Sequence, residues 1–542
     1  MKVSKKVLKV LSTVLAMLVL TASLGACANN EKEISGNDST LSFWGVLDTN
    51  VAASSIKSYS DLMLYQEMEK ITGIHVDFIH PISGSTGNEA FLTMLSGSEL
   101  PDIIEYNWST YNGGAQAAID DGIIVELNDY LEEYAPNYYD YMEGEKGKAN
   151  DYLYKYQSTS SEGNYYGFNR LQIGTARQFN AFFVRSDLLK KWEMSVPETI
   201  DDWSALFAKA KSEGIETPFT ADKTLTSNMH MAISFHNAFG VGSSFYLNDK
   251  KEVVFAPFEK GYKEFIAQMA EWVKLGYIDK GYITNDTATV VGKVTNGQAI
   301  ASIGGIGGHM GKIIPAGQTT DPDFMIVGCP YPVAKKGDKI EYLRLGGEAT
   351  GMANAITTQC TNIEKAVQWC DFVYSEEGFL LQTFGIEGDT YTVEEKDGEK
   401  HYVYTEKITK PENSGAHSIG EALYKYMLPA NHPGLDQHPD YLENYYQYES
   451  QKEALKFANR DNEIARKHVL PELAFTEDEL LRKTDIEMVA FDALEVALTD
   501  IILGKASIDT FEKAIEDAKN NGYDELIEIH QTAYERYMAK FE

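Results

Sequence analysis

Three stretches decide the predicted fold: LSFWG at residues 41–45, IHVDFI at 74–79 and LPDIIEY at 100–106. Each is a short run of apolar and β-branched residues, and the middle one alternates polar with apolar side chains, which is typical of a strand. Helical patterns separate the runs, and Gly73 gives the first helix its stop. Strand, helix, strand, helix, strand is the order that predicts a parallel α/β sheet.

The ends of these strands are the first candidate binding positions. Ligands of open α/β sheets bind beyond the carboxyl ends of the strands. Here those ends are Trp44, residues 80–84 and the run Tyr106-Asn107-Trp108. Flat aromatic rings stack on sugar rings, so Trp44, Tyr106 and Trp108 are candidates for ligand stacking. The same rings would equally suit a large hydrophobic core.

The N-terminus predicts export from the cell. Four lysines among the first nine residues precede an apolar run over 10–20, and Leu24-Gly25-Ala26-Cys27 follows. Basic, apolar and small-residue zones in this order are typical of a secretory signal, and the run is shorter than a membrane span. The last four residues resemble the bacterial lipobox, which implies cleavage after residue 26 and a lipid on Cys27. The alternative is an ordinary signal peptide with an incidental cysteine. Residues 27–40 would form a tether.

The charge of the chain is strongly acidic, with 48 basic and 81 acidic residues and a net charge of −33. Residues 1–26 contain four lysines and no acid, so their removal would lower the net charge to −37. Such a field repels polyanions and argues against nucleic-acid binding. About 500 mature residues exceed a single core, so more than one domain is expected.

The cysteines are too few for disulfide bonds to stabilise the fold. Beyond Cys27 there are only Cys329, Cys360 and Cys370, without a CxxC pair or zinc spacing. A Cys360–Cys370 bridge is conceivable, but the helical pattern around Cys370 favours buried thiols. We expect neither a metal nor another cofactor.

The last 70 residues follow a helical period. Thr476-Glu477-Asp478-Glu479 is a capping box that starts a long apolar-striped helix, and Gly504 ends that helix. Thr199 is predicted to cap an earlier helix. We therefore expect extra helices at the C-terminus.

Six groups of segments together resemble the family 1 extracellular solute-binding proteins of ABC importers, in particular their long lipoprotein branch. Each group is weakly specific alone, but their common order extends over nearly the whole mature chain. They are Leu100-Pro101-Asp102-Ile103; Asp121-Gly122 to Leu127-Asn128; Val184 to Leu189 with Val196 to Thr199 and Trp203; Gly297-Gln298-Ala299; Tyr374 to Gly378 with Phe384 to Gly388; and Ile502-Leu503-Gly504 with Gly522-Tyr523-Asp524.

The resemblance implies a two-lobed, periplasmic-binding-protein-like fold of type II, with a hinge and a central cleft. Carried over, lobe 1 would hold 41–172 and 293–350, and lobe 2 would hold 173–292 and 351–542. Hinge closure on a ligand would convert capture into delivery to the importer's membrane subunits. We expect a monomer, held at the outer face of the cell membrane through its lipid alone. The calcium loop of many relatives is missing, because 209–216 offers only two spaced carboxylates.

Further candidate ligand contacts come from polar and glycine-rich segments. Gly304–Lys312 is glycine-rich but fails the P-loop spacing, so we interpret it as a turn whose amides approach a ligand. The remaining candidates are polar residues near the predicted crossings, each with an ion pair, a structural histidine or a helix end as its alternative. In addition to Trp44, Tyr106 and Trp108, the full set is Asn107, Arg170, Gly305, His309, Glu348, Glu387 and Tyr391.

These patterns favour an extracellular, lipid-anchored receptor for an oligosaccharide that works without catalysis. Neither HExxH nor GxSxG occurs, and no catalytic residue is assigned. A secreted polysaccharide hydrolase stays open, since distant acids can meet in space. So does a sensor or adhesin that shares the fold without transport.

Overall fold

The computed structural model describes residues 40–54, 56–81, 87–223, 235–343 and 345–541. Its larger sheet has six strands in the order β13-β4-β10-β3-β1-β2. They are β1 (Thr40–Trp44), β2 (His75–Ile79), β3 (Ile103–Asn107), β4 (Phe168–Gln172), β10 (Ala349–Ile356) and β13 (Gly434–Asp436). The predicted signal peptide and Cys27 lie outside the described residues.

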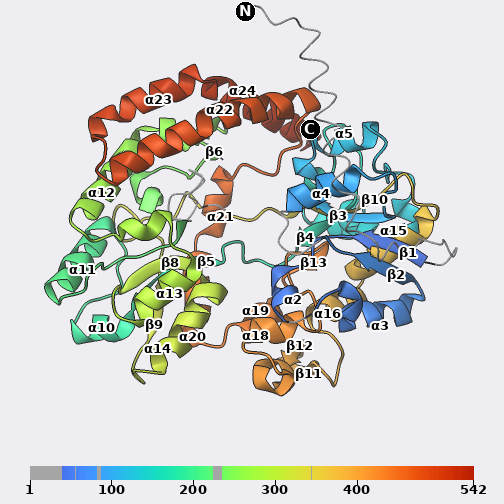
Figure 1. Ribbon diagram of the computed structural model, residues 1–542, viewed down its shortest axis with the longest axis horizontal. Helices are drawn as coiled ribbons and strands as arrows, with labels where there is room; N and C mark the ends of the chain where they lie inside the picture. The colour runs from blue at the N-terminus through green and yellow to red at the C-terminus, as the bar shows by residue number, and fades with distance from the viewer. Residues whose placement is uncertain (1–39, 55, 82–86, 224–234, 344, 542) are drawn as a thin grey trace, which may run out of the picture. The chain divides into compact units, whose positions relative to one another are not determined.

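The predicted strand–helix–strand order is confirmed in this sheet. Helices α3 (Met63–Thr72) and α4 (Gly87–Leu95) connect β1, β2 and β3, and β1 pairs parallel with β3. Strand β10 runs antiparallel between β3 and β4, and β13 joins β4 in parallel. The sheet is therefore mixed, and its edge strands come from opposite parts of the chain, β2 from early and β13 from late (Figure 1).

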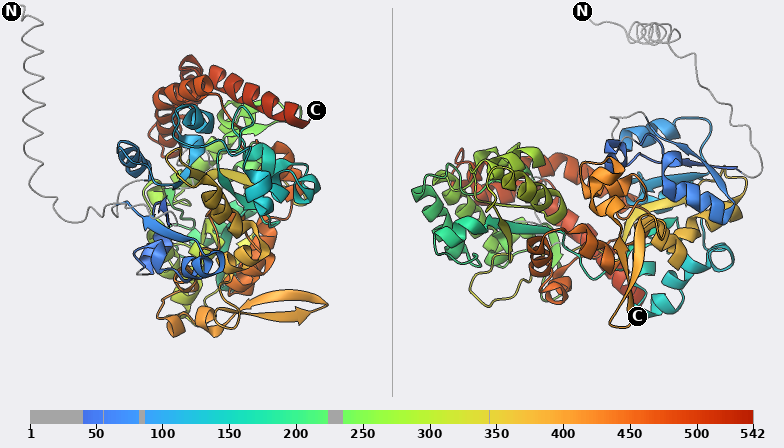
Figure 2. Two further views of the ribbon diagram at one scale, coloured as in Figure 1. Left: turned by 90° about the vertical axis from the view of Figure 1, so that its right-hand side faces the viewer. Right: turned by 90° about the horizontal axis from the view of Figure 1, so that it is seen from below.

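The smaller sheet has three antiparallel strands in the order β8-β5-β9. They are β5 (Asn180–Arg185), β8 (Ala301–Gly305) and β9 (Ile326–Cys329). Two hairpins complete the strands, β6–β7 (Phe245–Leu247, Val253–Phe255) and β11–β12 (Tyr391–Lys396, Glu399–Tyr404). The second hairpin projects from the helices around it (Figure 2).

Helices cover both sheets. Those near the larger sheet are α2 (Thr49–Ala53), α5 (Gly114–Asp120), α6 (Leu131–Tyr134), α7 (Pro136–Met142), α8 (Glu145–Ala149), α9 (Leu153–Gln157), α15 (Ile363–Asp371), α16 (Glu376–Thr383), α17 (Glu406–Thr409), α18 (Ile419–Tyr424) and α19 (Pro439–Tyr445). Those near the smaller sheet are α10 (Ser186–Lys191), α11 (Ile200–Ser212), α12 (Lys260–Lys274), α13 (Thr287–Thr295), α14 (Gly311–Gln318), α20 (Glu449–Ala458), α21 (Asn462–Ala465), α22 (Glu477–Ile502), α23 (Phe511–Asn520) and α24 (Tyr523–Met538).

Separate hydrophobic cores form around the two sheets. Neighbouring residues of β3 serve opposite faces of the larger sheet, so Ile103 packs with α15 and α16 while Ile104 packs under α4 and α5. The smaller sheet is buried with α11, α12 and α22 in another cluster that includes Trp203 and Trp272. The predicted two-lobed α/β fold is confirmed.

The observed pairing of strands differs from the predicted division into lobes. Residues 293–350 were assigned with 41–172, but β8 and β9 hydrogen-bond to β5 and share its core. Conversely, α15–α19 and β13 belong to the core of the larger sheet rather than to a lobe made of 351–542. The chain passes between the cores at 173–179, at 346–348 and near Tyr445, which packs against both cores. Periodicity carries no information about such pairing, because the partners lie far apart in sequence.

Local signals in the sequence are confirmed at the helix ends. Both Thr199 and Thr476 form capping boxes, at the starts of α11 and α22. Cys329, Cys360 and Cys370 are free, buried thiols. Across the described residues, no helix combines the length and apolarity that a membrane span needs.

Candidate functional site

The aromatic residues predicted for ligand stacking lie in the core. Trp108 has no exposed surface, and its Nε1 donates to the Ala353 carbonyl at 3.2 Å. Tyr106 stacks on Phe91 with ring centroids 3.6 Å apart, and Trp44 packs against the same ring. Phe91 belongs to helix α4, so the aromatic rings at the ends of β1 and β3 pack against this helix inside the protein. In this structure the core alternative applies, and these rings are not available for stacking.

The remaining polar candidate at this edge is Asn107. It is half-buried, and its Oδ1 accepts a hydrogen bond from the Ser109 hydroxyl at 2.7 Å. Met352 of β10 pairs with Asn107, which brings Thr350 and Gly351 to the carboxyl end of β3. The Thr350 hydroxyl is buried without a hydrogen-bond partner among the described residues. Polar groups from two strands therefore meet at this edge.

Arg170 forms an ion pair inside the protein. On β4, it binds the almost fully buried Asp436 carboxylate of the parallel strand β13. Burial raises the pKa of Asp436 against the opposing effect of Arg170. The ion-pair alternative thus applies to Arg170, and its partner was unpredictable because 266 residues separate the two.

A buried charge cluster next to this pair was missed by the sequence analysis. His432 lies between Glu105 of β3, 3.4 Å from Nδ1, and Asp48 before α2, 3.8 Å from Nε2. Burial alone would lower the pKa of His432, but the two carboxylates raise it to about 9. Asp48 also caps α2 by accepting from the amides of Asn50 and Val51. An Asp before a short helix is a signal that could have been read as a cap.

The smaller sheet offers a glycine-rich edge. Strand β8 ends at Gly304-Gly305, and the Gly305 amide donates to His309 Nδ1 at 3.0 Å. His309 Nε2 lies 3.3 Å from Asp222 Oδ2, and both side chains are buried. Gly308 has open space where a Cβ would lie. The turn therefore combines His309, whose ring is held on both sides, with an open backbone at Gly308.

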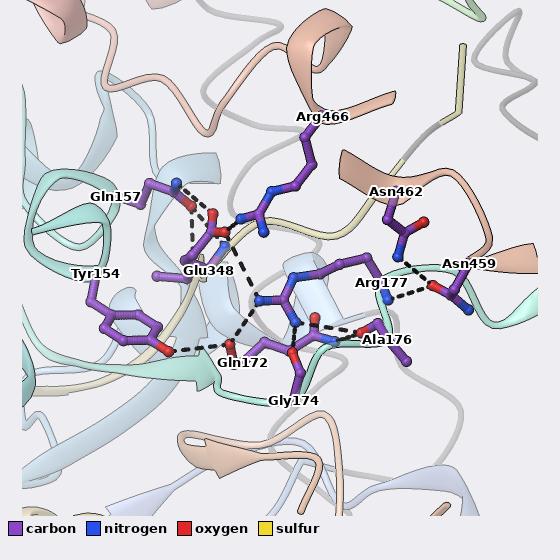
Figure 3. A network of polar contacts seen from close by, with 11 residues as sticks. Tyr154, Gln157, Gln172, Gly174, Ala176, Arg177, Glu348, Asn459, Asn462 and Arg466 are labelled. Atoms are coloured by element: carbon purple, nitrogen blue, oxygen red, sulfur yellow. Dashed lines mark hydrogen bonds and ion pairs between the residues drawn. The ribbon is translucent and has the colours of Figure 1, made fainter. Parts of the chain in front are cut away.

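Glu348 lies in a network where the chain crosses between the cores (Figure 3). Its carboxylate pairs with Arg466 and accepts from Gln157 Nε2 at 3.0 Å, while Arg177 Nη2 lies 3.9 Å away. Gln157 also accepts from the amides of Glu348 and Ala349. The Glu348 carboxylate is thus bound by side chains of the protein itself, as the ion-pair alternative predicts.

Arg177 ties the first crossing segment to the same network. Its guanidinium donates to the carbonyls of Gly174 and Gln172, and burial together with Arg466 lowers its pKa to about 10. Asn459, after α20, accepts from the amides of Arg177 and Gln178 at 2.9 and 3.0 Å. Side chains from three crossing or flanking segments therefore fix one another (Figure 3).

A cavity at this junction has a volume of about 730 Å³ and is lined by residues of both cores. Glu348 and Thr350 line one side, and the rings of Tyr246, Tyr342 and Tyr537 line another. Glu387 and Tyr391, in contrast, line a separate groove beside α3 and α16. The predicted set is therefore not assembled into one site, although Asn107, Gly305 and His309 lie at strand ends and Glu348 lies at a crossing.

Comparison with known proteins gives one family and a consistent set of structures. The family model described as bacterial extracellular solute-binding protein matches residues 53–378. No curated protein matches the chain. The fold is similar to that of the FusA substrate-binding protein of an ABC transporter from S. pneumoniae in complex with kestose, at a TM-score of 0.72, 18% identity, and coverage of 92% of this chain and 100% of the other.

Two further structures show the same fold. An HMO-binding, ABC-transporter-associated solute-binding protein from Bifidobacterium longum infantis superposes with a TM-score of 0.71 at 16% identity, over 92% of this chain and 99% of the other. The alginate-binding protein AlgQ2 superposes with a TM-score of 0.69 at 19% identity, over 92% and 98%.

Proposed function

The chain belongs to the family of bacterial extracellular solute-binding proteins, and on that premise we propose that it captures an oligosaccharide outside the cell and delivers it to an ABC importer. The family match carries this proposal, because residues 53–378 include strands of both sheets and all of the first two crossings. The similar structures whose names mention kestose, HMO and alginate support a carbohydrate as the solute.

We place the solute at the facing strand ends of the two sheets. Asn107, Ser109 and Thr350 would contribute from the larger sheet, and the Gly305–His309 turn with Asp222 from the smaller one. Sugar hydroxyls need donors and acceptors together, and amides, hydroxyls and a carboxylate supply both. The crossings at 173–179, at 346–348 and near Tyr445 would act as the hinge.

A ligand screen by thermal unfolding tests the solute class. Binding to the folded state stabilises it by about 2.7 kcal/mol at a hundredfold excess over Kd. We expect a rise in Tm with one class of oligosaccharide and none with amino acids or peptides. An unchanged Tm with every carbohydrate would refute this solute class.

Paired variants test the position. His309→Gln should weaken binding because it alters the turn at the end of β8, whereas Tyr537→Ala in the junction cavity should leave the affinity unchanged. The opposite result would move the site into the cavity.

Anchoring and the absence of catalysis are part of the same proposal. Fatty-acid labelling in the native host should disappear in Cys27→Ala, and persistent labelling would contradict the anchor. Incubation of the purified protein with the solute found in the screen should release no product. Product release would favour the hydrolase alternative, while normal uptake of the solute in a deletion strain would favour the non-transport receptor.

A further inference from the structure

A groove on the core of the larger sheet, away from the crossing segments, carries four glutamates over an apolar floor. It has a volume of about 540 Å³ and lies between α3, α16 and the loop 384–390. Leu380, Leu381 and Ile386 form the floor. None of its described lining residues is basic. Both Glu387 and Tyr391, predicted from the sequence to reach the solute, belong to this groove instead.

The carboxylates of the rim are largely uncompensated. Glu67 pairs with Lys70 at 2.6 Å, but Glu376, Glu377 and Glu387 form no ion pair with a described residue. Two of these acids are explained locally, since Glu376 and Glu377 occupy the first turn of α16, where negative charge stabilises the helix. Glu387 lies outside a helix N-terminus, so helix stabilisation does not explain its negative charge, and its side chain is exposed in the loop.

The loop that presents Glu387 is braced by internal hydrogen bonds. Gly385 and Gly388 adopt φ of 85° and 81°, which permits the tight path. Thr390 is fully buried, accepts from the Ile386 amide at 2.8 Å and donates to the Phe384 carbonyl at 2.6 Å. This network holds Ile386 at the floor and Glu387 at the rim in fixed positions, as a binding surface requires.

The apolar component of the groove extends to the surface. Ile71, at the end of α3, is 41% exposed although it is a large aliphatic residue. An apolar groove that is partly open to solvent and edged by carboxylates is complementary to an apolar side chain flanked by lysine or arginine. An anionic lipid surface would be repelled by the same rim.

We propose that this groove docks a partner protein through a segment that carries leucine-like side chains between basic residues. The inference does not depend on which solute the protein binds, because the groove and the strand ends are different surfaces. Glu387 is the specific rim contact, and Ile71 with Leu380 receives the apolar side chain.

Fluorescence polarisation with short labelled peptides tests the proposal on the full folded chain. The probe contains two leucines four residues apart, flanked by lysines; one counterpart replaces each lysine with glutamate, and the other replaces each leucine with serine. We expect the lysine–leucine peptide alone to bind, with affinity falling at high salt.

Variants separate docking from general attraction to an acidic protein. Glu387→Lys should weaken binding about fivefold, the equivalent of about 1 kcal/mol for a rim charge pair. Glu132→Lys makes the same charge change at an exposed position of α6 on the same core, and should change affinity less than about twofold. Glu387→Gln provides a milder second variant.

Three outcomes would overturn the proposal. The first is no binding of the lysine–leucine peptide at about 1 mM. The second is equal weakening by Glu387→Lys and Glu132→Lys, which would indicate only non-specific attraction. The third is equal binding of the serine counterpart, because the floor would then have no role.

Discussion

In the larger sheet, β1 ends at Trp44 and β3 is followed directly by Trp108. In the smaller sheet, β8 ends in Gly304-Gly305. The rings of Trp44 and Trp108 turn inward to Phe91 of α4, and the charges beside them pair with one another as Arg170–Asp436 and as His432 with its two carboxylates. At the smaller sheet, the His309 ring packs against Gly304 and accepts from the Gly305 amide, while the space beside Gly308 is open.

The difference shows that residue type at a strand end does not fix its role. A large ring is buried wherever a covering helix offers an apolar surface, because burial is worth several kcal/mol. Glycine has no side chain to bury, so the backbone at the exposed Gly308 stays open to solvent, although Gly304 is covered by His309. We therefore infer that side chains stabilise the first edge and that the second edge presents its backbone.

Trp108→Ala should have the largest effect on stability. Loss of a fully buried indole and of its hydrogen bond to Ala353 should lower the free energy of unfolding by about 4 kcal/mol. Urea unfolding measures it, and Ile79→Ala at the exposed end of β2 serves as the control, with a change under about 0.5 kcal/mol. Unchanged stability combined with lost solute binding would place the ring in the site.

His432→Gln should lower the free energy of unfolding by about 3 kcal/mol at pH 6, because it leaves the largely buried carboxylates of Asp48 and Glu105 without their cation. The folded pKa of about 9 is above the unfolded value of about 6.5, so the stabilisation is complete below pH 6.5 and disappears as the pH rises through 9.

Unfolding at pH 6 and pH 9.5 measures this dependence. Asp436 and Tyr59 also face the cluster, but burial raises the pKa of Tyr59 well above its ordinary value, so its hydroxyl stays neutral over this range. A difference between wild type and variant that stays constant with pH would show that His432 is not held as a cation.

Gly304→Ala should destabilise the second edge by about 2 kcal/mol, because its Cβ would lie 2.5 Å from His309 Nδ1. Gly308→Ala is the matched control, since no atom lies within 4 Å of its Cβ and its change should stay under about 0.5 kcal/mol. Thermal unfolding and solute titration on both variants compare the two positions. If Gly304→Ala and Gly308→Ala lowered stability equally, the contact between position 304 and His309 would not explain why a glycine is needed there.

Ser109→Ala should have the smallest effect, about 1 kcal/mol, because it removes one partly buried hydrogen bond to Asn107. Its effect on solute affinity is the informative readout. A large loss of affinity with little loss of stability would show that the first edge also binds the solute through polar groups.

Local features of the fold were predictable from the sequence. The strands β1 to β3, the helices between them and the capping boxes at Thr199 and Thr476 depend on residues only a few positions apart. Such interactions leave a short periodic or capping pattern. The family resemblance, carried by motifs in a fixed order, was recognisable for the same reason.

The candidate site was predictable only in part. Asn107, Gly305 and His309 do lie at strand ends, as the carboxyl-edge rule indicates. Glu348, by contrast, is neutralised by Arg466, and Trp108 is closed off by Phe91 and Ala353. The pairing of His432 with its carboxylates left no pattern in the sequence, because the three residues come from three distant segments.

By itself, the sequence determined the α/β class, the helix caps, the acidic charge and the family. Only the tertiary structure decided that β8 and β9 join β5, that β13 joins β4, and which strand-end side chains are buried. The physical reason is range: caps and periodicity act within one or two turns, whereas pairing and burial depend on which distant surfaces exclude water together.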